Sequence, residues 1–409
     1  MRGTLELAWR NLLRKRGRSA VSAGAVAVVV FLTLIYFGLA GALQNGMYDN
    51  LTASTGHLQV RAANYRELRA FSDLLLRDAG ALRARLEAEA PENAQLVAAL
   101  SVPGLVEGDG RSRGVVLEGV SRAPGLQARY TARALAAGRL PAEDDLTGVA
   151  LSQSLARALA VGLGGTVYVY APGTEGYGAA AYTVVGLLEI PGGAPVAEVS
   201  LAAAQELAAP DAVTRMELHL ADFGRSDDPT LPALQAALGE RLGDGVSLPT
   251  WRELNPGVAA YLDIIPATTS VVTLVFFVLA GLLVTNTVYL SVIERVREFG
   301  VIKALGAPRG RVLGMVLAES LILCGFGALA GAALGLGVVG VMAQGFSFPP
   351  AYTELLGDAG LPEVLYATLT PTQVAVATLF TVLTGVCAAL LPAFTALRLE
   401  PVEAMRFSA

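Results

Sequence analysis

The stretch IIPATTSVVTLVFFVLAGLLVTNTVYLSVI, from Ile264 to Ile293, contains no charged residue and decides the fold of this chain. Three further uncharged stretches have similar lengths: Ser19–Tyr48, Ser320–Thr353 and Val364–Leu397. A helix of about 20 apolar residues crosses a bilayer core about 30 Å thick, so each stretch is long enough. The first also exceeds the apolar core of about 7 to 15 residues in a signal peptide. The sequence therefore predicts four transmembrane helices.

The four stretches are spaced unevenly along the 409 residues. About 215 residues of mixed composition separate the first stretch from the second, whereas the later gaps are short. Mean hydropathy is +0.54, and 54% of the residues are hydrophobic, values typical of a membrane protein. The predicted fold is a membrane protein with four transmembrane α-helices, one N-terminal and three C-terminal. A large α+β extracytoplasmic domain lies between the first and the second.

The basic residues predict how the chain is oriented. Of 30 Lys and Arg, six precede the first stretch, five lie between the second and third, and two follow the fourth. Cytoplasmic loops carry an excess of basic residues, so we expect both termini in the cytoplasm. The chain is then a multi-pass protein of the inner (cytoplasmic) membrane. Its outer domain carries 17 Arg against 26 acidic residues, a net charge of −9, which argues against nucleic acid as a partner.

The predicted segments follow one another along the chain. They are a cytoplasmic amphipathic helix (1–18), transmembrane helix 1 (19–44), the outer domain (45–262), transmembrane helix 2 (263–293), a cytoplasmic loop (294–319), transmembrane helix 3 (320–345), an outer loop (346–365), transmembrane helix 4 (366–397) and a cytoplasmic tail (398–409). Within the outer domain we expect a β-rich core at about 101–222, with membrane-proximal flanks at 45–100 and 223–262. Trp9 is expected to anchor the first helix in the membrane interface.

The outer domain mixes helical and β-like patterns. Apolar residues recur every three or four positions from Leu68 to Leu86, which predicts a helix. Shorter helices are expected at Ser154–Leu163 and Ala202–Ala209, while 225–250 is polar and interrupted by proline. Runs rich in Val, Tyr and Leu predict strands at Val115–Val120, Gly148–Ser152, Thr166–Tyr170, Tyr182–Leu188 and Met216–Leu220.

Residues that could carry chemistry are few. The four stretches contain no charge, which argues against an ion channel or a proton-coupled transporter. No segment matches the phosphate-binding loop GxxxxGK[ST], so we do not expect this chain to bind ATP by that route. His57 and His219 lack partners at metal-ligand spacing, and Glu143–Asp145 is expected to be a solvated turn. We predict no catalytic residue, cofactor or metal, and expect Cys324 and Cys387 to be packing residues.

The loop between the second and third stretches is the most informative polar segment. It contains REFGVIKALGA, in which Phe299, Ile302 and Leu305 recur at intervals of three and Pro308 follows. A short helix with an exposed apolar face suits docking into a groove on a soluble partner. A plain connector at the membrane surface is the alternative. The residues expected to dock are Arg297, Glu298, Phe299, Gly300, Ile302, Lys303, Ala304, Leu305, Gly306 and Ala307.

Three glycines in the third stretch share one helix face. Gly327, Gly331 and Gly335 recur every four residues. Such a face lets a neighbouring backbone approach closely. We expect it to pack against another helix, within the chain or across a dimer.

Several segments resemble one known family. REFGVIKALGA, with the stretch up to Glu319, is similar to a signature around a coupling helix; LAWRNLLRKRGRS (7–19) resembles an N-terminal amphipathic helix, and LRLEPVEAMR (397–406) a cytoplasmic tail. All three are features of the permease subunits of the MacB / LolC–LolE / FtsX superfamily of ABC transporters, which this chain resembles. Residues 134–141 and 148–170 resemble its periplasmic core domain, although Gly165 stands where the family often has an acidic residue. The segment TGHLQV, from Thr55 to Val60, resembles the LolC/LolE-like branch.

The resemblance implies a function. A separate cytoplasmic ATPase dimer, which would bind ATP and Mg, docks on the loop, and the spans pass its movement to the outer domain by mechanotransmission. Pro401, Val402 and Met405 of the tail would also contact it. The permease itself is non-catalytic and pairs with a second permease subunit, identical or homologous, among the membrane lipids. Lipoprotein release is the favoured role, with a lipoprotein, peptide or hydrophobic compound as substrate. The alternatives are a MacB-like efflux permease and an FtsX-like regulator of a cell-wall hydrolase.

Overall fold

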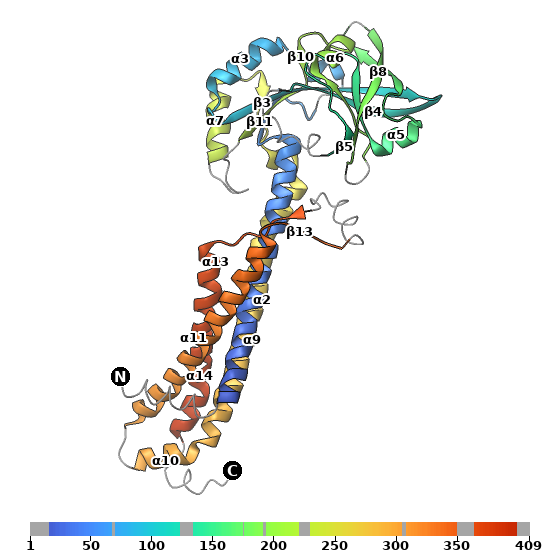
Figure 1. Ribbon diagram of the computed structural model, residues 1–409. Helices are drawn as coiled ribbons and strands as arrows, with labels where there is room; N and C mark the ends of the chain where they lie inside the picture. The colour runs from blue at the N-terminus through green and yellow to red at the C-terminus, as the bar shows by residue number, and fades with distance from the viewer. Residues whose placement is uncertain are drawn as a thin grey trace. The chain divides into compact units, whose positions relative to one another are not determined.

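The computed structural model describes residues 16–67, 70–122, 134–174, 176–190, 194–220, 230–304, 308–349 and 364–398. They belong to two compact units, which are described separately (Figure 1). The helical unit takes in Met1–Gln44, Leu262–Ser347 and Val364–Ala409. The sheet unit takes in Asn45–Tyr261 and Phe348–Glu363.

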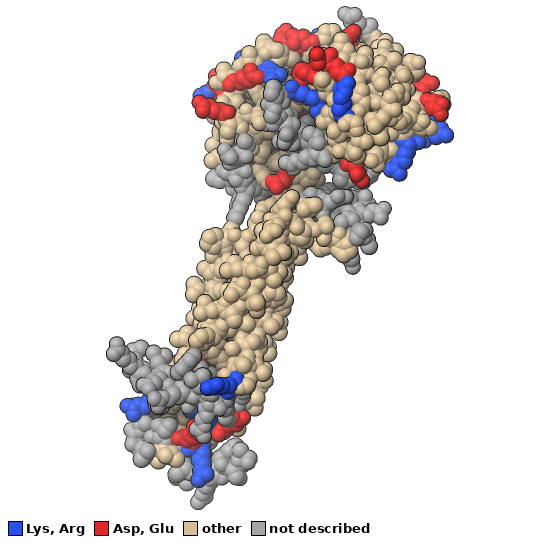
Figure 2. All heavy atoms as spheres, in the orientation of Figure 1, with Lys and Arg blue, Asp and Glu red and all other residues tan. Residues whose placement is uncertain are grey.

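The prediction of four transmembrane helices is confirmed, since four helices are long and apolar enough to cross a membrane. They are α2 (Arg16–Thr55), α9 (Pro256–Glu294), α11 (Arg309–Met342) and a C-terminal helix made of α13 (Pro371–Ala375), the π-helical turn η3 (Val376–Phe380) and α14 (Thr381–Arg398). Short strands β13 (Phe346–Ser347) and β14 (Val364–Leu365) pair beside them. On the face that Figure 2 shows, no Lys, Arg, Asp or Glu appears in the middle of the bundle.

The four helices pack against one another through apolar side chains. Ser22 of α2 donates a hydrogen bond of 3.2 Å to Thr287 of α9, and Tyr36 packs edge-on against Phe276. Thr285 of α9 donates to the Ala388 carbonyl of α14. Buried Val, Ala and Leu side chains of all four helices fill the space between them.

One prediction about α9 is wrong. Transmembrane helix 2 was predicted at 263–293, which would place Pro266 in its first turn, where a missing N–H costs least. The helix instead begins ten residues earlier at Pro256, so Pro266 lies inside it. The earlier start follows from α8 (Trp251–Leu254), whose last turn leads into Pro256 almost without a break. Residues 256–261 of α9 belong to the sheet unit.

The strands of the sheet unit pair in a closed ring. The order round the ring is β3 (Ala94–Gly108), β4 (Arg111–Val120), β9 (Ala197–Ser200), β6 (Gly148–Ser152), β8 (Gly176–Leu188) and β7 (Thr166–Gly173), which pairs again with β3. The ring closes because β3 is long. Its first half pairs with β11 (Arg215–Leu220), and its second half pairs with β7.

Further strands extend the sheet beyond this ring. β1 (Leu58–Ala62) pairs with β11 and with β12 (Val246–Ser247), and β5 (Leu135–Gly138) pairs with β8. Alternate residues of the ring strands are buried in one apolar cluster together with α5 (Gln153–Leu159) and α6 (Leu201–Leu207). Both helices start at a serine that accepts a backbone N–H, Ser152 from Leu155 and Ser200 from Ala203.

All five predicted strands are present, but the predicted helix from Leu68 to Leu86 is confirmed only from Ala79 onward. The chain forms a 3₁₀ turn η1 (Phe71–Leu74), strand β2 (Leu76–Arg77) and helix α3 (Ala79–Glu89) instead. Strand β2 pairs with β10 (Ala212–Val213), and this pairing overrides the helical periodicity. The polar segment 225–250 contains a helix that was not predicted, α7 (Thr230–Leu242), which buries Leu231 and Leu238.

Candidate functional site

The connection between α9 and α11 contains the candidate functional site. α9 ends at Glu294, Arg295 forms a turn, and α10 (Val296–Ala304) follows. α11 then starts after Pro308, whose fixed φ and missing N–H suit a helix start. Residues Leu305–Ala307 lie outside the described part of the chain.

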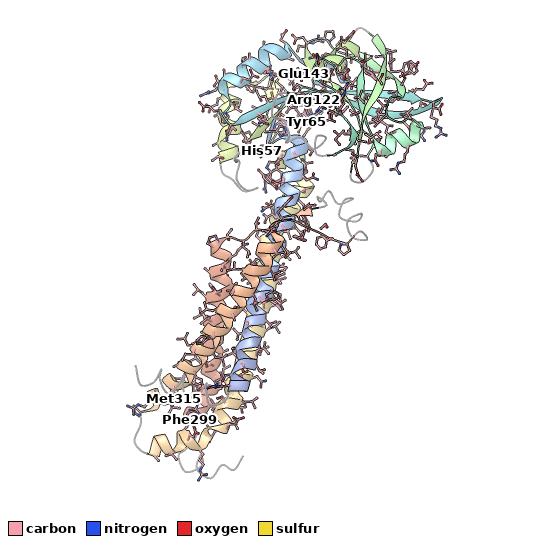
Figure 3. All side chains as sticks on the ribbon, viewed as in Figure 1. His57, Tyr65, Arg122, Glu143, Phe299 and Met315 are labelled. Carbon is pink, nitrogen blue, oxygen red and sulfur yellow. The ribbon has the colours of Figure 1, made fainter. Side chains whose placement is uncertain are left out.

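Arg295 holds α10 against α11. Its Nε is 3.0 Å from a carboxylate oxygen of Glu298, and its Nη1 is 3.0 Å from one of Glu319 on α11. The guanidinium lies 5.1 Å from the centre of the Phe299 ring, which suits a cation–π contact. Figure 3 shows Phe299 and Met315 at the same end of the helical unit. One side chain thus joins α9, α10 and α11.

The prediction that Phe299 lies on an exposed face is wrong. Its side chain is buried among Val292, Val312 and Met315, because the turn at Arg295 folds α10 back onto α11. Val296 and Gly300 are buried as well. The exposed side of α10 carries Arg297, Glu298, Val301 and Ala304. The structure does not describe the side chains of Ile302 and Lys303, nor Trp9, Pro401, Val402 and Met405.

The three glycines of α11 lie against α2. A Cβ atom would lie 2.6 Å from the Ala23 carbonyl oxygen at Gly327, 2.3 Å from that of Ala27 at Gly331, and 2.9 Å from Leu34 at Gly335. Each separation is shorter than real Cβ contacts allow. Of the two alternatives raised by the sequence, these distances correspond to packing within one chain.

The ion pair between Arg295 and Glu319 can be measured by a double-mutant cycle. We expect Arg295→Met, Glu319→Gln and the double variant to give an interaction energy of about 1–2 kcal/mol, because both side chains are mostly buried. Thermal unfolding of the full chain in detergent gives the three stabilities. Glu298→Gln is the control, since its carboxylate is half exposed and should matter by less than about 0.5 kcal/mol. Additive single variants would contradict the pairing.

A second polar cluster lies in the sheet unit, and the sequence did not predict it. Arg215 of β11 is 2.8 Å from Glu217 and 2.9 Å from Glu118 of β4, and His219 is 3.2 Å from Glu217. Ser101 of β3 donates to Glu118. Burial acts to lower the pKa of Arg215, but Glu118 and Glu217 raise it overall, so the guanidinium stays charged. These residues share one face of neighbouring strands, which only the strand register reveals.

The acidic run Glu143–Asp145 forms the predicted turn, with Glu143 and Asp144 exposed, but Asp145 also makes structural contacts. Asp145 pairs with Arg139 at 2.8 Å and accepts the backbone N–H of Gly148 at 2.8 Å. Burial opposes but does not outweigh the Arg139 contact and these backbone bonds, which lower the pKa of Asp145. Glu143 accepts the backbone N–H of Arg122. Within the described ranges, no three His, Cys, Asp or Glu side chains are grouped so as to hold a metal ion.

Comparison with protein families gives two matches that together cover most of the chain. The model of the FtsX-like permease C-terminal family matches residues 270–401. The model of the MacB-like periplasmic core domain family matches residues 19–236, just over half of the chain. The first match includes α10 and the second includes the closed ring of strands.

Individual relatives are more distant. The chain is 29% identical over 164 residues to an uncharacterized ABC transporter permease, YknZ, of Bacillus subtilis. That alignment covers 40% of this chain and 37% of YknZ. It is 35% identical over 138 residues to the macrolide export ATP-binding/permease protein MacB of Shewanella oneidensis. That alignment covers 33% of this chain and 18% of MacB. The chain thus spans well under half the length of these curated relatives.

Solved structures resemble part of the chain weakly. The periplasmic region of MacB from Actinobacillus actinomycetemcomitans is 14% identical and has a TM-score of 0.36, with 52% of this chain and 97% of that chain covered. The extracellular domain of the noncanonic ABC-type transporter YknZ from Gram-positive bacteria is 12% identical with a TM-score of 0.33, with 47% and 99% covered.

Proposed function

Because the chain belongs to the ABC transporter permeases of the MacB/FtsX type, we propose that it is the subunit that carries movement across the membrane. A separate cytoplasmic ATPase binds α10 and supplies the movement. The spans transmit it, and the sheet unit acts on a substrate at the outer side. The permease carries no catalytic step of its own in this scheme. It works with a second permease subunit, identical or homologous.

One observation supports this proposal above the others: α10 is anchored on one side and exposed on the other. Arg295, Glu319 and Phe299 fix the inner side of α10 to α9 and α11. Arg297, Val301 and Ala304, at i, i+4 and i+7, form its exposed side. Because α10 is fixed to α9 and α11 and exposed to a partner, a movement of the bound ATPase would be transmitted through α10 to those two spans. A plain surface connector would not need the anchor.

The charge distribution supports the proposed orientation in the inner membrane. Basic residues follow α9 at Arg295 and Arg297, and Arg309 and Arg311 lie in the first turn of α11. Short cytoplasmic loops carry such residues. Figure 2 shows Lys and Arg side chains of the helical unit at one end of the bundle. The N- and C-termini and α10 are then cytoplasmic, and the sheet unit lies outside.

The proposed substrate is an acylated one, and the proposed reaction is lipoprotein release from the inner membrane. The support for this is the segment Thr55–Val60, which resembles the LolC/LolE-like branch. Export is the rival, because several relatives carry the name macrolide export ATP-binding/permease protein. Mild purification from the host followed by mass spectrometry tests both. A retained acylated peptide supports release, whereas an ATPase that a macrolide stimulates, without such a peptide, supports export.

Val301→Glu tests the docking of the ATPase on α10. Val301 is 45% exposed, so a carboxylate there should leave the fold intact but would be buried unpaired in the complex. We expect at least a tenfold loss of affinity for the ATPase, about 1.4 kcal/mol or more. The measurement is co-purification from the native host, with thermal unfolding to check the fold.

Val116→Glu is the matched control for this experiment. Val116 is 48% exposed and lies on β4 of the sheet unit, so the same substitution there should leave association unchanged. Normal recovery of the ATPase with Val301→Glu would remove α10 as the docking element. Recovery of no ATPase with the unmodified protein would remove the proposed function itself.

A further inference from the structure

A short segment of the sheet unit lies where two long helices reach the sheet. α2 ends at Thr55, Gly56 and His57 follow, and β1 begins at Leu58. α8 begins at Trp251 and leads into α9 at Pro256. Figure 3 places His57 beside the end of α2. We call Tyr48, Gly56, His57 and Trp251 the helix–sheet joint. All four residues belong to the same compact unit.

His57 contacts all three elements that meet here. Its backbone N–H donates to the Leu218 carbonyl of β11 at 2.8 Å, and its carbonyl accepts the N–H of Trp251 at 3.1 Å. Its ring nitrogen Nδ1 accepts the N–H of Leu220 at 3.1 Å. The ring packs edge-on against Tyr48 of α2, with ring centres 6.1 Å apart.

The joint is tightly packed. Tyr48 also meets the Trp251 ring edge-on, with centres 5.3 Å apart. The exposed fractions of Tyr48, His57 and Trp251 are 6%, 8% and 1%. Aromatic pairs of this geometry add about 0.5–1.5 kcal/mol to the effect of burial. α2 and α8 are therefore held to each other as well as to the strand.

Gly56 brings the end of α2 directly onto β11. Its φ of +71° is in the left-handed region that favours glycine. Its N–H donates to the Thr52 carbonyl, which ends the helix, and a Cβ atom here would lie 3.0 Å from the Leu218 carbonyl oxygen. The chain therefore passes from helix to strand within two residues, Gly56 and His57, which leaves little chain to absorb a movement of α2.

The ring of His57 is neutral. Burial, assisted by the nearby His219, lowers the pKa of His57 to about 4. A neutral imidazole has one acceptor nitrogen, and the Leu220 N–H fixes it as Nδ1. This acceptor is what distinguishes His57 from a residue that only fills space.

We infer that His57 is a positioning residue for transmission: it ties the outer ends of both α2 and α8–α9 to β11, so that a movement of the first two spans reaches the sheet. The inference rests on the proposed function, because it needs an ATPase that moves the spans. Beyond that function, it identifies His57 as the residue through which the movement reaches the sheet unit. From β11 the ladder of backbone bonds continues directly into β3 of the closed ring.

Two substitutions separate the contacts of His57. His57→Phe keeps the ring against Tyr48 but removes the acceptor for Leu220, whereas His57→Asn keeps an acceptor near the position of Nδ1. Tyr182→Phe is the matched control, since it removes another buried polar contact of the sheet unit, the Tyr182 hydroxyl to the Ala203 carbonyl. Should His57→Phe fail to fold, His57→Gln, in which the acceptor is displaced by one methylene group, takes its place.

Amide hydrogen exchange of the full-length protein in nanodiscs gives both readouts. Without ATPase, we expect His57→Phe to raise exchange of the Leu220 N–H at least tenfold, and His57→Asn to restore it to within about threefold. In the complex with its ATPase, ATP with vanadate should change exchange in β11 and β3 of the unmodified protein. His57→Phe should lose that change while ATPase binding and turnover stay within twofold. Tyr182→Phe should behave as the unmodified protein.

Three results would overturn the inference, and they are distinguishable. Unchanged exchange of Leu220 in His57→Phe would show that this residue does not hold the joint. A nucleotide-dependent change that persists in His57→Phe would show that transmission does not pass through it. If the unmodified protein binds no ATPase, the proposed function fails and the inference fails with it. In the first two cases the ATPase remains bound, so the proposed function stands.

Discussion

Arg215→Met is expected to lower the free energy of unfolding of the sheet unit by about 3–5 kcal/mol. The guanidinium lies between Glu118 and Glu217 and also donates to Ser101. Glu217 is fully buried, so its carboxylate would lose its strongest partner without gaining water. Removing one member of a buried ion cluster costs far more than the cluster contributes as a whole, because the remaining charges stay desolvated.

Denaturant unfolding followed by the fluorescence of Trp251 measures this effect, since that side chain is buried in the sheet unit. Arg113→Met on β4 is the control: this arginine is exposed, and its loss should change stability by less than about 0.5 kcal/mol. Adding Glu118→Gln and Glu217→Gln to Arg215→Met should recover part of the loss. A loss under about 1 kcal/mol in the single variant would mean that the cluster is not held as described.

Gly331→Leu is expected to separate α11 from α2. A Cβ atom at Gly331 would lie 2.3 Å from the Ala27 carbonyl oxygen and 2.9 Å from its Cα, so backbone must move rather than a flexible side chain. Overpacking costs about 1–3 kcal/mol, and it reaches the upper end of that range where backbone is displaced. Lipid-exposed helices gain little from the hydrophobic effect, so close packing is what holds them together.

Gly337, on the same helix as Gly331, is the control for this prediction. A Cβ atom at Gly337 would meet no other atom within 4 Å. Gly337→Leu should leave the unfolding temperature in detergent within about 2 °C of the unmodified protein, whereas Gly331→Leu should lower it by several degrees. Equal effects of the two substitutions would indicate that the glycines serve helix flexibility rather than the contact with α2.

The spans could be predicted because each depends on consecutive residues. Twenty uncharged positions in a row define a transmembrane helix whatever surrounds them. The same holds for β7, in which Thr, Val and Tyr, all residues that favour strands, lie next to one another in sequence. The helix predicted from Leu68 to Leu86 begins only at Ala79, because a partner far along the chain, β10, pairs with β2 just before it.

The face of α10 could not be predicted in the same way. Periodicity shows that Phe299 and Ile302 share a side of the helix, but it does not say what that side meets. Arg295 and Glu319 decide this, because their ion pair folds α10 back onto α11 and buries Phe299. The exposed side of the helix is consequently the one with Val301 and Ala304.

The sequence by itself determined the number of spans, their asymmetric spacing and the strand-rich character of the domain between them, since hydropathy and β-propensity are local. Only the tertiary structure decided which polar residues act together. Arg215 meets Glu118, 97 positions away, and Leu220 meets His57, 163 positions away. Strand register brings such residues together, and register depends on the packing of the whole sheet rather than on any one segment.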